Sequence, residues 1–155
     1  MIGWLKGSKI TSWTSGTRSG LIINCSGIGY EVQLLPRQIV DLNSQNEIEI
    51  WVHQIHKDEG VSLYGFREIR ERDLFRKLIN VNGIGPQIAL SLLENTKYDD
   101  LITAICEEDK NTLKKAQGVG SRMAERILVE LKDKLDNFKL ESITIAETKQ
   151  STEYI

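Results

Sequence analysis

The stretch NGIGPQIA, at residues 82–89, returns as QGVGSRMA at residues 117–124. Gly83 and Gly118 set a constant offset of 35 residues (118 − 83), and apolar residues at helical spacing flank each copy. Glycine accepts the positive φ angles with which a chain reverses direction within a few residues. The repeat therefore predicts two helical hairpins, one after the other, in the second half of the chain.

Each predicted hairpin is suited to binding an anion. Glycines leave backbone N–H groups uncovered at the start of the next helix, where the helix dipole adds partial positive charge. The apolar residue between the glycines, Ile84 or Val119, is expected to point inward and anchor the loop. Pro86 suits the first helical position, because the N–H that proline lacks would have no intrahelical partner there. The pattern is typical of the helix-hairpin-helix motif, which contacts DNA phosphates without reading base sequence.

The residues expected at a DNA backbone share a place in these turns or just after them. They are Asn82, Gly83, Ile84, Gly85, Gln87, Gly118, Val119, Gly120, Ser121, Arg122 and Arg126. Arg122 and Arg126 are one helical turn apart, so they are expected to share a face near the second hairpin. Gln87 stands in the first copy where Arg122 stands in the second, so it offers a hydrogen bond without a charge.

The first 65 residues favour strands over helices. Alternating apolar and polar residues and β-branched runs are typical of short strands, which are expected near residues 3–10, 21–23, 30–34, 47–52 and 61–64. A turn region rich in Ser, Thr and Gly is expected at 11–20, and one short helical turn at 36–42. Five such strands fit an OB-like Greek-key barrel.

The fold class predicted is therefore α+β with two domains. An OB-like barrel is expected at 1–65 and an all-α tandem helix-hairpin-helix domain at 66–135, while the polar segment 136–155 is interpreted as a linker or tail. The sequence shows neither a membrane span nor a secretory signal, so the cytoplasm is the expected location. The formal net charge of −2 weighs against a nucleic-acid binder, although opposite faces can carry opposite signs.

With these segments in place, the sequence resembles the RuvA family from its start to about residue 134. The matching segments, in the family's order and spacing, are MIGWLKG at 1–7, GIGYEV at 27–32, LYGF at 63–66, NGIGP at 82–86, GVG at 118–120 and AER at 124–126. The resemblance implies a DNA-binding subunit that is not an enzyme by itself and needs neither cofactor nor metal. ATP hydrolysis would belong to the motor RuvB, in agreement with the absence of a phosphate-binding Gly-x-x-x-x-Gly-Lys motif.

The resemblance also implies partners. A homotetramer, or two tetramers joined as an octamer, would hold a four-way Holliday junction open and planar during recombination and repair, with RuvC in the wider complex. Asp58 and Glu59 occupy the place of the family's acidic pin, a hairpin whose carboxylates lie at the crossover and guide the separated strands. From spacing alone, an ordinary Asp-Glu-Gly surface turn is the favoured interpretation of these residues, and the resemblance favours the pin.

Two departures from the family pattern affect these expectations. Gln87 and Ser121 stand where basic residues are expected after the hairpins, which would weaken phosphate binding or leave it to other residues. The family also has a third, small domain that binds RuvB, and this sequence stops inside what resembles the linker before it. The chain is therefore expected to bind junctions without recruiting RuvB.

Three alternatives stay open. Aromatic residues could stack on bases in a general duplex or single-strand binder, although at strand spacing they are more often core; they are Trp4, Trp13, Trp51 and Tyr30. A helix-hairpin-helix glycosylase would need a catalytic aspartate, for which Asp99 and Asp100 are candidates by position only. His53 and His56 could contact a metal, but polar barrel surface is the favoured interpretation.

Overall fold

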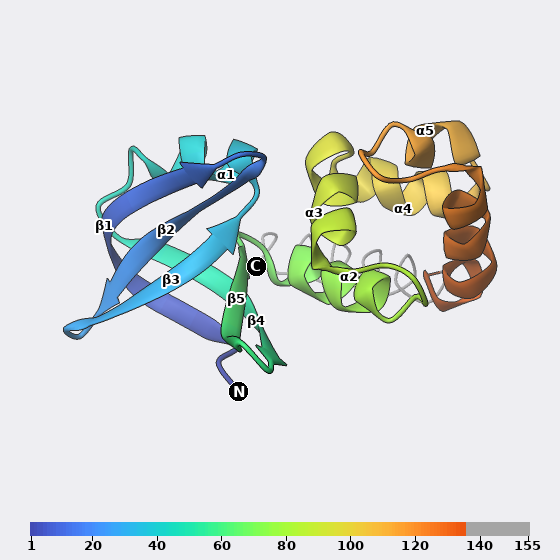
Figure 1. The fold of residues 1–155 in the computed structure, drawn as a ribbon. Helices are drawn as coiled ribbons and strands as arrows, with labels where there is room; N and C mark the ends of the chain where they lie inside the picture. The colour runs from blue at the N-terminus through green and yellow to red at the C-terminus, as the bar shows by residue number, and fades with distance from the viewer. Residues whose placement is uncertain (136–155) are drawn as a thin grey trace, which may run out of the picture. The chain divides into compact units, whose positions relative to one another are not determined.

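The computed structural model describes residues 1–135, and the linker predicted at 136–155 lies outside the described residues. The chain divides into two compact units, Met1–Lys77 and Leu78–Ile155 (Figure 1). The domain limits expected from the sequence, 1–65 and 66–135, remain a prediction. No helix in the described part of the chain is long and apolar enough to cross a membrane.

Five strands of the first unit close into a barrel in the order β1-β2-β3-β5-β4 (Figure 1). They are β1 (Trp4–Ser15), β2 (Arg18–Cys25), β3 (Ile28–Leu34), β4 (Ile48–Lys57) and β5 (Gly60–Phe66). Neighbouring strands are antiparallel, except that β3 and β5 pair in parallel. The predicted combination of a five-stranded barrel followed by helices is confirmed.

The turn region predicted at 11–20 is wrong for most of its length. Strand β1 continues to Ser15 and β2 begins at Arg18, so only Gly16 and Thr17 form the turn. Trp13 pairs across the strands with Gly20, and a Cβ atom on Gly20 would lie 2.5 Å from the indole ring. Pairing with β2 therefore extends β1 through a segment whose Ser, Thr and Gly content indicated a loop.

The barrel interior is filled by side chains from alternate positions of its strands. The core residues are Leu5, Leu21, Ile23, Val32, Leu34, Leu42, Ile48, Ile50 and Val52. Leu42 comes from α1 (Pro36–Leu42), the short helix that was predicted there. Gly65 lies where β5 passes closest to this core, because a Cβ atom there would lie 2.6 Å from the side chains of Ile50 and Val32.

Helix α2 (Ile69–Ile79) contributes Phe75 to an aromatic cluster with three residues of the barrel strands. The ring centroid of Phe75 lies 5.0 Å from Phe66, 5.4 Å from Tyr64 and 5.8 Å from His53. Phe66 and Phe75 are fully buried. Helix α2 is thus held to the barrel by apolar burial, which stabilises by roughly 25 cal/mol for each Å² removed from water.

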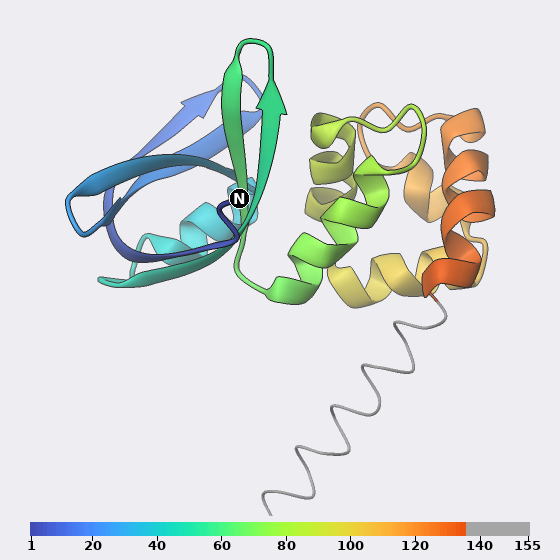
Figure 2. The ribbon, with the colours of Figure 1, turned by 90° about the horizontal axis from the view of Figure 1, so that it is seen from below.

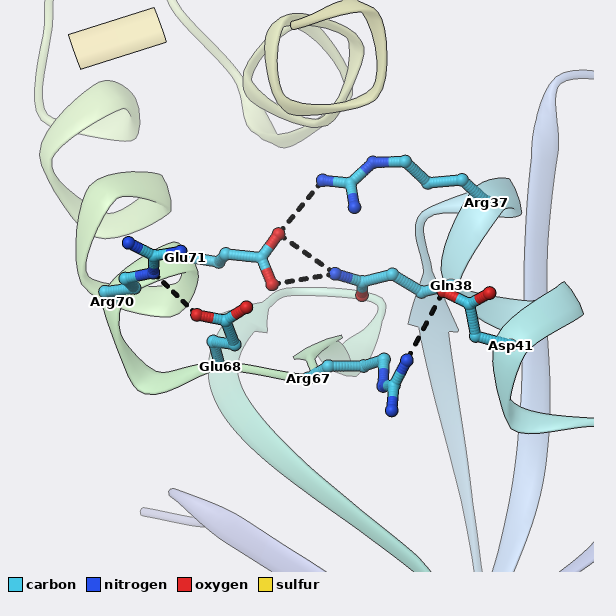
Figure 3. A network of polar contacts seen from close by, with 7 residues as sticks. All are labelled: Arg37, Gln38, Asp41, Arg67, Glu68, Arg70 and Glu71. Atoms are coloured by element: carbon cyan, nitrogen blue, oxygen red, sulfur yellow. Dashed lines mark hydrogen bonds and ion pairs between the residues drawn. The ribbon is translucent and has the colours of Figure 1, made fainter. Parts of the chain in front are cut away.

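A polar network joins α2 to α1 in the same unit (Figure 3). Glu71 is 4% exposed, and its carboxylate accepts hydrogen bonds from Arg37 at 3.0 Å and from the Gln38 amide at 2.9 and 3.0 Å. Beside it, Arg67 pairs with Asp41 at 3.3 Å on the surface. A buried carboxylate is tolerated only when donors surround it, and Arg37 and Gln38 supply them here.

Short helices make up the described part of the second unit (Figure 2). They are α3 (Pro86–Asn95), α4 (Tyr98–Cys106), α5 (Lys110–Lys114) and a helix that covers residues 121–135. Each helix turns an apolar side inward, and the fully buried residues include Leu93, Leu101, Ile105, Leu113, Ala124 and Ile127. The two Gly-x-Gly repeats lie in the connection from α2 to α3 and in the connection from α5 to the helix at 121–135.

Candidate nucleic-acid interface

The first hairpin joins the end of α2 to α3. Gly83 has a φ of +89°, a conformation that L side chains rarely adopt, so glycine is favoured there. The N–H of Ile84 donates to the carbonyl oxygen of Val81 at 3.0 Å, and the Ile84 side chain is buried. Gly85 is extended and caps α3, which begins at Pro86 as expected.

The second hairpin has the same construction. Gly118 has a φ of +86°, and the N–H of Val119 donates to Ala116 at 3.1 Å. The next helix opens with a bond from Ala124 to Gly120 at 3.0 Å, which matches the bond from Ala89 to Gly85 at 3.1 Å in the first copy. The offset of 35 residues therefore holds in backbone geometry as well as in sequence.

The second glycine of each turn leaves room for a ligand. A Cβ atom on Gly85 or Gly120 would meet no atom within 4 Å, and neither residue has a positive φ. The fold by itself does not demand glycine at these two places. A bare, exposed backbone directly before a helix suits the close approach of a phosphate oxygen, because the uncovered N–H groups and the helix dipole both favour an anion.

The two repeats carry different charges beside their hairpins. Ser121, Arg122 and Arg126 line one shallow surface depression with Gly120, so the two arginines share a face as their spacing predicted. Gln87 is half-buried in the first turn of α3. Glu125 pairs with Lys110 at 2.6 Å, and this hydrogen bond lowers the pKa of the Glu125 carboxyl. The only acidic residue between Arg122 and Arg126 is thus engaged by a lysine.

One contact of Arg126 was not expected from the sequence. Its Nη1 atom donates to the carbonyl oxygen of Asn82, in the first hairpin, at 2.9 Å. The alignment of the two repeats gives one signal that could have indicated this contact. Arg126 aligns with Ser91, so the second repeat has a cation at a position where the first repeat has none. The other predicted backbone-binding residues all lie in or directly after the two turns.

Asp58 and Glu59 form the two-residue turn between β4 and β5, and both are exposed. Lys57 and Gly60 close this turn, and Gly60 has a φ of +136°. Pairing of β4 with β1 ends at Trp51, whereas its pairing with β5 continues to Lys57. The hairpin therefore projects from the barrel, as Figure 2 shows for the green strands, and it carries the two carboxylates at its tip.

The two histidines of β4 have separate partners. His53 Nδ1 accepts a hydrogen bond from Arg76 Nε at 3.0 Å, whereas His56 Nε2 lies 2.7 Å from the Gln54 amide. Burial, and then the nearby charges of Arg76 and Arg72, lower the pKa of His53. These separate partners do not favour a shared metal, and the described residues contain no group of three potential ligands.

The three tryptophans, Trp4, Trp13 and Trp51, are not part of the barrel core, whereas Tyr30 is partly buried and packs against it. Trp4 is 44% exposed, and its ring centroid is 6.4 Å from that of the half-buried Trp51. Arg72 covers Trp51, with its guanidinium carbon 5.4 Å from the ring centroid. The preference for a core position was wrong for Trp4, because Leu5 beside it takes the inward-facing position on β1.

The aspartates considered for a glycosylase lie in the first turn of α4. Asp99 and Asp100 are both exposed there. Acidic side chains at a helix N-terminus are stabilised by the helix dipole. A structural role therefore accounts for both.

Comparison with known proteins covers both units. The family described as RuvA N terminal domain matches residues 1–65, and the family described as SAM-like Helix-hairpin-helix tandem matches residues 75–133. The chain is similar to the Holliday junction branch migration complex subunit RuvA of Prochlorococcus marinus (strain NATL1A), with 49% identity over 99% of this chain and 68% of the relative. The protein of the same name from Synechococcus sp. (strain CC9311) is 52% identical over 91% of this chain and 64% of the relative.

Proposed function

This chain belongs to the RuvA family, and we propose that it is the Holliday-junction-binding subunit of a RuvAB branch-migration complex. It supplies DNA binding, and the ATP-dependent motor activity belongs to RuvB. The observation that carries the proposal is the pair of hairpins in the second unit, which repeat one backbone geometry at an offset of 35 residues. Each hairpin offers a phosphate-binding loop, so the unit holds a DNA arm by its backbone without reading sequence.

We assign the backbone contacts to the residues of the two turns and to the arginines after the second. Arg122 is exposed beside Gly120 and donates to a phosphate through its planar fork of N–H groups. Gln87 provides a neutral donor at the equivalent place in the first copy. Ser121 replaces a basic residue in the second copy, so Arg122 carries the charge beside Gly120.

The β4–β5 hairpin is proposed to act as an acidic pin. Asp58 and Glu59 are exposed at the tip of a projecting hairpin. Carboxylates repel phosphates, so these residues do not add to affinity. At the centre of a junction they would instead keep the crossover open and keep the separated strands apart.

A four-way junction has four equivalent arms, which suits an assembly of four copies. We therefore propose a homotetramer, or an octamer that encloses the junction from both sides. RuvB would be recruited through a third domain of the family, and RuvC would act in the wider complex. The cytoplasm, where bacterial DNA lies, is the proposed location.

A gel-shift titration tests the function directly. A synthetic four-way junction is compared with a linear duplex of the same arm sequence at two salt concentrations. We expect the junction to bind far more tightly, with an affinity that falls steeply with salt, because each neutralised phosphate contributes about −0.9 to the slope of log K against log salt. Equal, weak binding of both DNAs would contradict junction recognition and leave a general duplex binder.

A further inference from the structure

The two hairpins agree in backbone geometry but not in charge. Arg122 follows Gly120 by two residues in the second hairpin, whereas the first has the neutral Gln87 at the equivalent place after Gly85. A phosphate in the first hairpin would therefore meet no cation from its own repeat. Hydrogen bonds from charged groups to phosphate are roughly twice as strong as those from neutral groups.

Arg126 approaches the first hairpin from the second repeat. Its guanidinium donates to the Asn82 carbonyl at 2.9 Å, and a Cβ atom on Gly83 would lie 3.0 Å from the same Nη1 atom. Arg126 is exposed, so the bond to Asn82 leaves part of the guanidinium open to solvent. A guanidinium has five N–H donors in a rigid fork, and one bond to a carbonyl leaves others to point at a ligand.

We infer that Arg126 is the cation and the positioning residue of the first hairpin. It holds the carbonyl of Asn82, and with it the loop, while its remaining donors face the phosphate bound there. This inference rests on the proposed function and adds an assignment to it: each hairpin uses one arginine, although both arginines belong to the second repeat.

In the opposite direction, the first repeat contacts the second hairpin through an apolar side chain. Ile88 of the first repeat lies 3.5 Å from the position of a Cβ atom on Gly118. The second hairpin has Arg122 from its own repeat and needs no cation from the other. Arg126 is therefore expected to matter to the first hairpin and much less to the second.

Two glycines provide matched backgrounds for the test. Gly83→Ala and Gly118→Ala impose the same substitution at nearly the same φ, but only Gly83 lies against Arg126. Arg126→Gln is measured alone and in each background, by titration of a linear duplex and of a four-way junction over a range of salt. Circular dichroism and thermal unfolding establish that each variant is folded.

Arg126→Gln is expected to weaken binding by at least about tenfold, the effect of removing one charged hydrogen bond. The same loss of affinity should appear in the Gly118→Ala background and shrink to less than about twofold in the Gly83→Ala background. The slope of log K against log salt should fall by about 0.9 for each phosphate that is no longer neutralised. Arg126→Lys should recover the slope without recovering the full affinity, because lysine keeps the charge but does not have the planar fork.

A second route does not depend on the glycine variants. Gln87→Arg places a cation at the first hairpin, so it should improve binding more in the Arg126→Gln background than in the original chain. Equal gains in the two backgrounds would overturn the inference. Equal losses of affinity from Arg126→Gln in both glycine backgrounds would overturn it too, and so would no loss at all.

Failure of the proposed function gives a different result. If the junction binds no more tightly than the duplex, junction recognition fails, while the duplex titrations still decide the role of Arg126. If the original chain binds neither DNA, both proposals are overturned.

Discussion

Replacing Glu71 by alanine should destabilise the first unit far more than breaking the neighbouring surface ion pair. Gln38 is 1% exposed, and its amide donates to both carboxylate oxygens of Glu71 at 2.9 and 3.0 Å. The substitution leaves this buried donor unsatisfied, which costs about 1–3 kcal/mol. It also removes a carboxylate that pairs with Arg37 at 3.0 Å.

Loss of the ion pair with Arg37 should lower the free energy of unfolding by less than loss of a fully buried ion pair would. Breaking a buried ion pair costs about 3–5 kcal/mol, but the Arg37 side chain is 33% exposed and can regain water. We therefore expect Glu71→Ala to lower the free energy of unfolding by about 2–4 kcal/mol. At about 4–8 °C for each kcal/mol, the midpoint of thermal unfolding should fall by at least about 8 °C.

Tryptophan fluorescence during urea and thermal unfolding is a suitable assay. All three tryptophans, Trp4, Trp13 and Trp51, lie in the first unit and report on it alone. Asp41→Ala is the matched control, because its ion pair with Arg67 joins side chains that are 57% and 38% exposed and should contribute less than about 1 kcal/mol. Equal losses of stability from Glu71→Ala and Asp41→Ala would refute the argument from burial.

Three further predictions concern pH, packing and the β4–β5 hairpin. Burial and two arginines lower the pKa of His53 below its ordinary value of 6.5. As the pH falls, this histidine therefore takes up a proton in the unfolded chain before it does so in the folded chain, so the free energy of unfolding should fall as the pH drops through 6.5. Urea titrations at several pH values measure this, and His53→Gln should flatten the dependence. Gly65→Ala should cost about 1–3 kcal/mol in the same titration, because the added methyl group would lie 2.6 Å from core side chains. Asp58→Asn with Glu59→Gln should leave junction affinity equal or higher, because the carboxylates repel phosphates, while 2-aminopurine fluorescence should report less base unpairing at the crossover.

Each of these predictions has a control within the chain. His56→Gln is the matched comparison, because His56 is exposed and lies beside the Gln54 amide, not beside an arginine; if it flattens the pH dependence as much as His53→Gln does, the burial argument fails. Gly85→Ala adds a methyl group that meets no atom within 4 Å, so a loss of stability equal to that of Gly65→Ala would contradict the packing argument. Glu31→Gln removes another exposed carboxylate of the barrel and should not affect base unpairing. If Glu31→Gln reduced base unpairing as much as the change of Asp58 and Glu59, the effect would come from the general negative charge of the barrel and not from an acidic pin.

Most of the candidate interface could be predicted from local sequence. A Gly-x-Gly turn with positive φ at its first glycine depends on a few adjacent residues, and both copies have it. Ile84 and Val119 are buried between the glycines, as their apolar side chains indicated. The DNA contacts assigned to these turns, the domain limits and the acidic pin remain predictions.

Segments whose structure depends on distant partners were predicted less well. Residues 11–15 have a loop-like composition and are a strand, because β2 pairs with them and Trp13 packs on Gly20. Trp4 was expected in the core and is 44% exposed, because the choice of inward face depends on which residues the neighbouring strands bury.

Sequence information alone was sufficient for the fold class, the duplicated hairpins and the family, because glycine conformation and the repeat of residue types are local properties of the chain. Tertiary structure was needed to show that Glu71 is enclosed by α1 and that Arg126 reaches Asn82, 44 residues away. Such bonds form only when helices far apart in sequence pack together and bring side chains within hydrogen-bond distance. No spacing rule within one helix or strand predicts them.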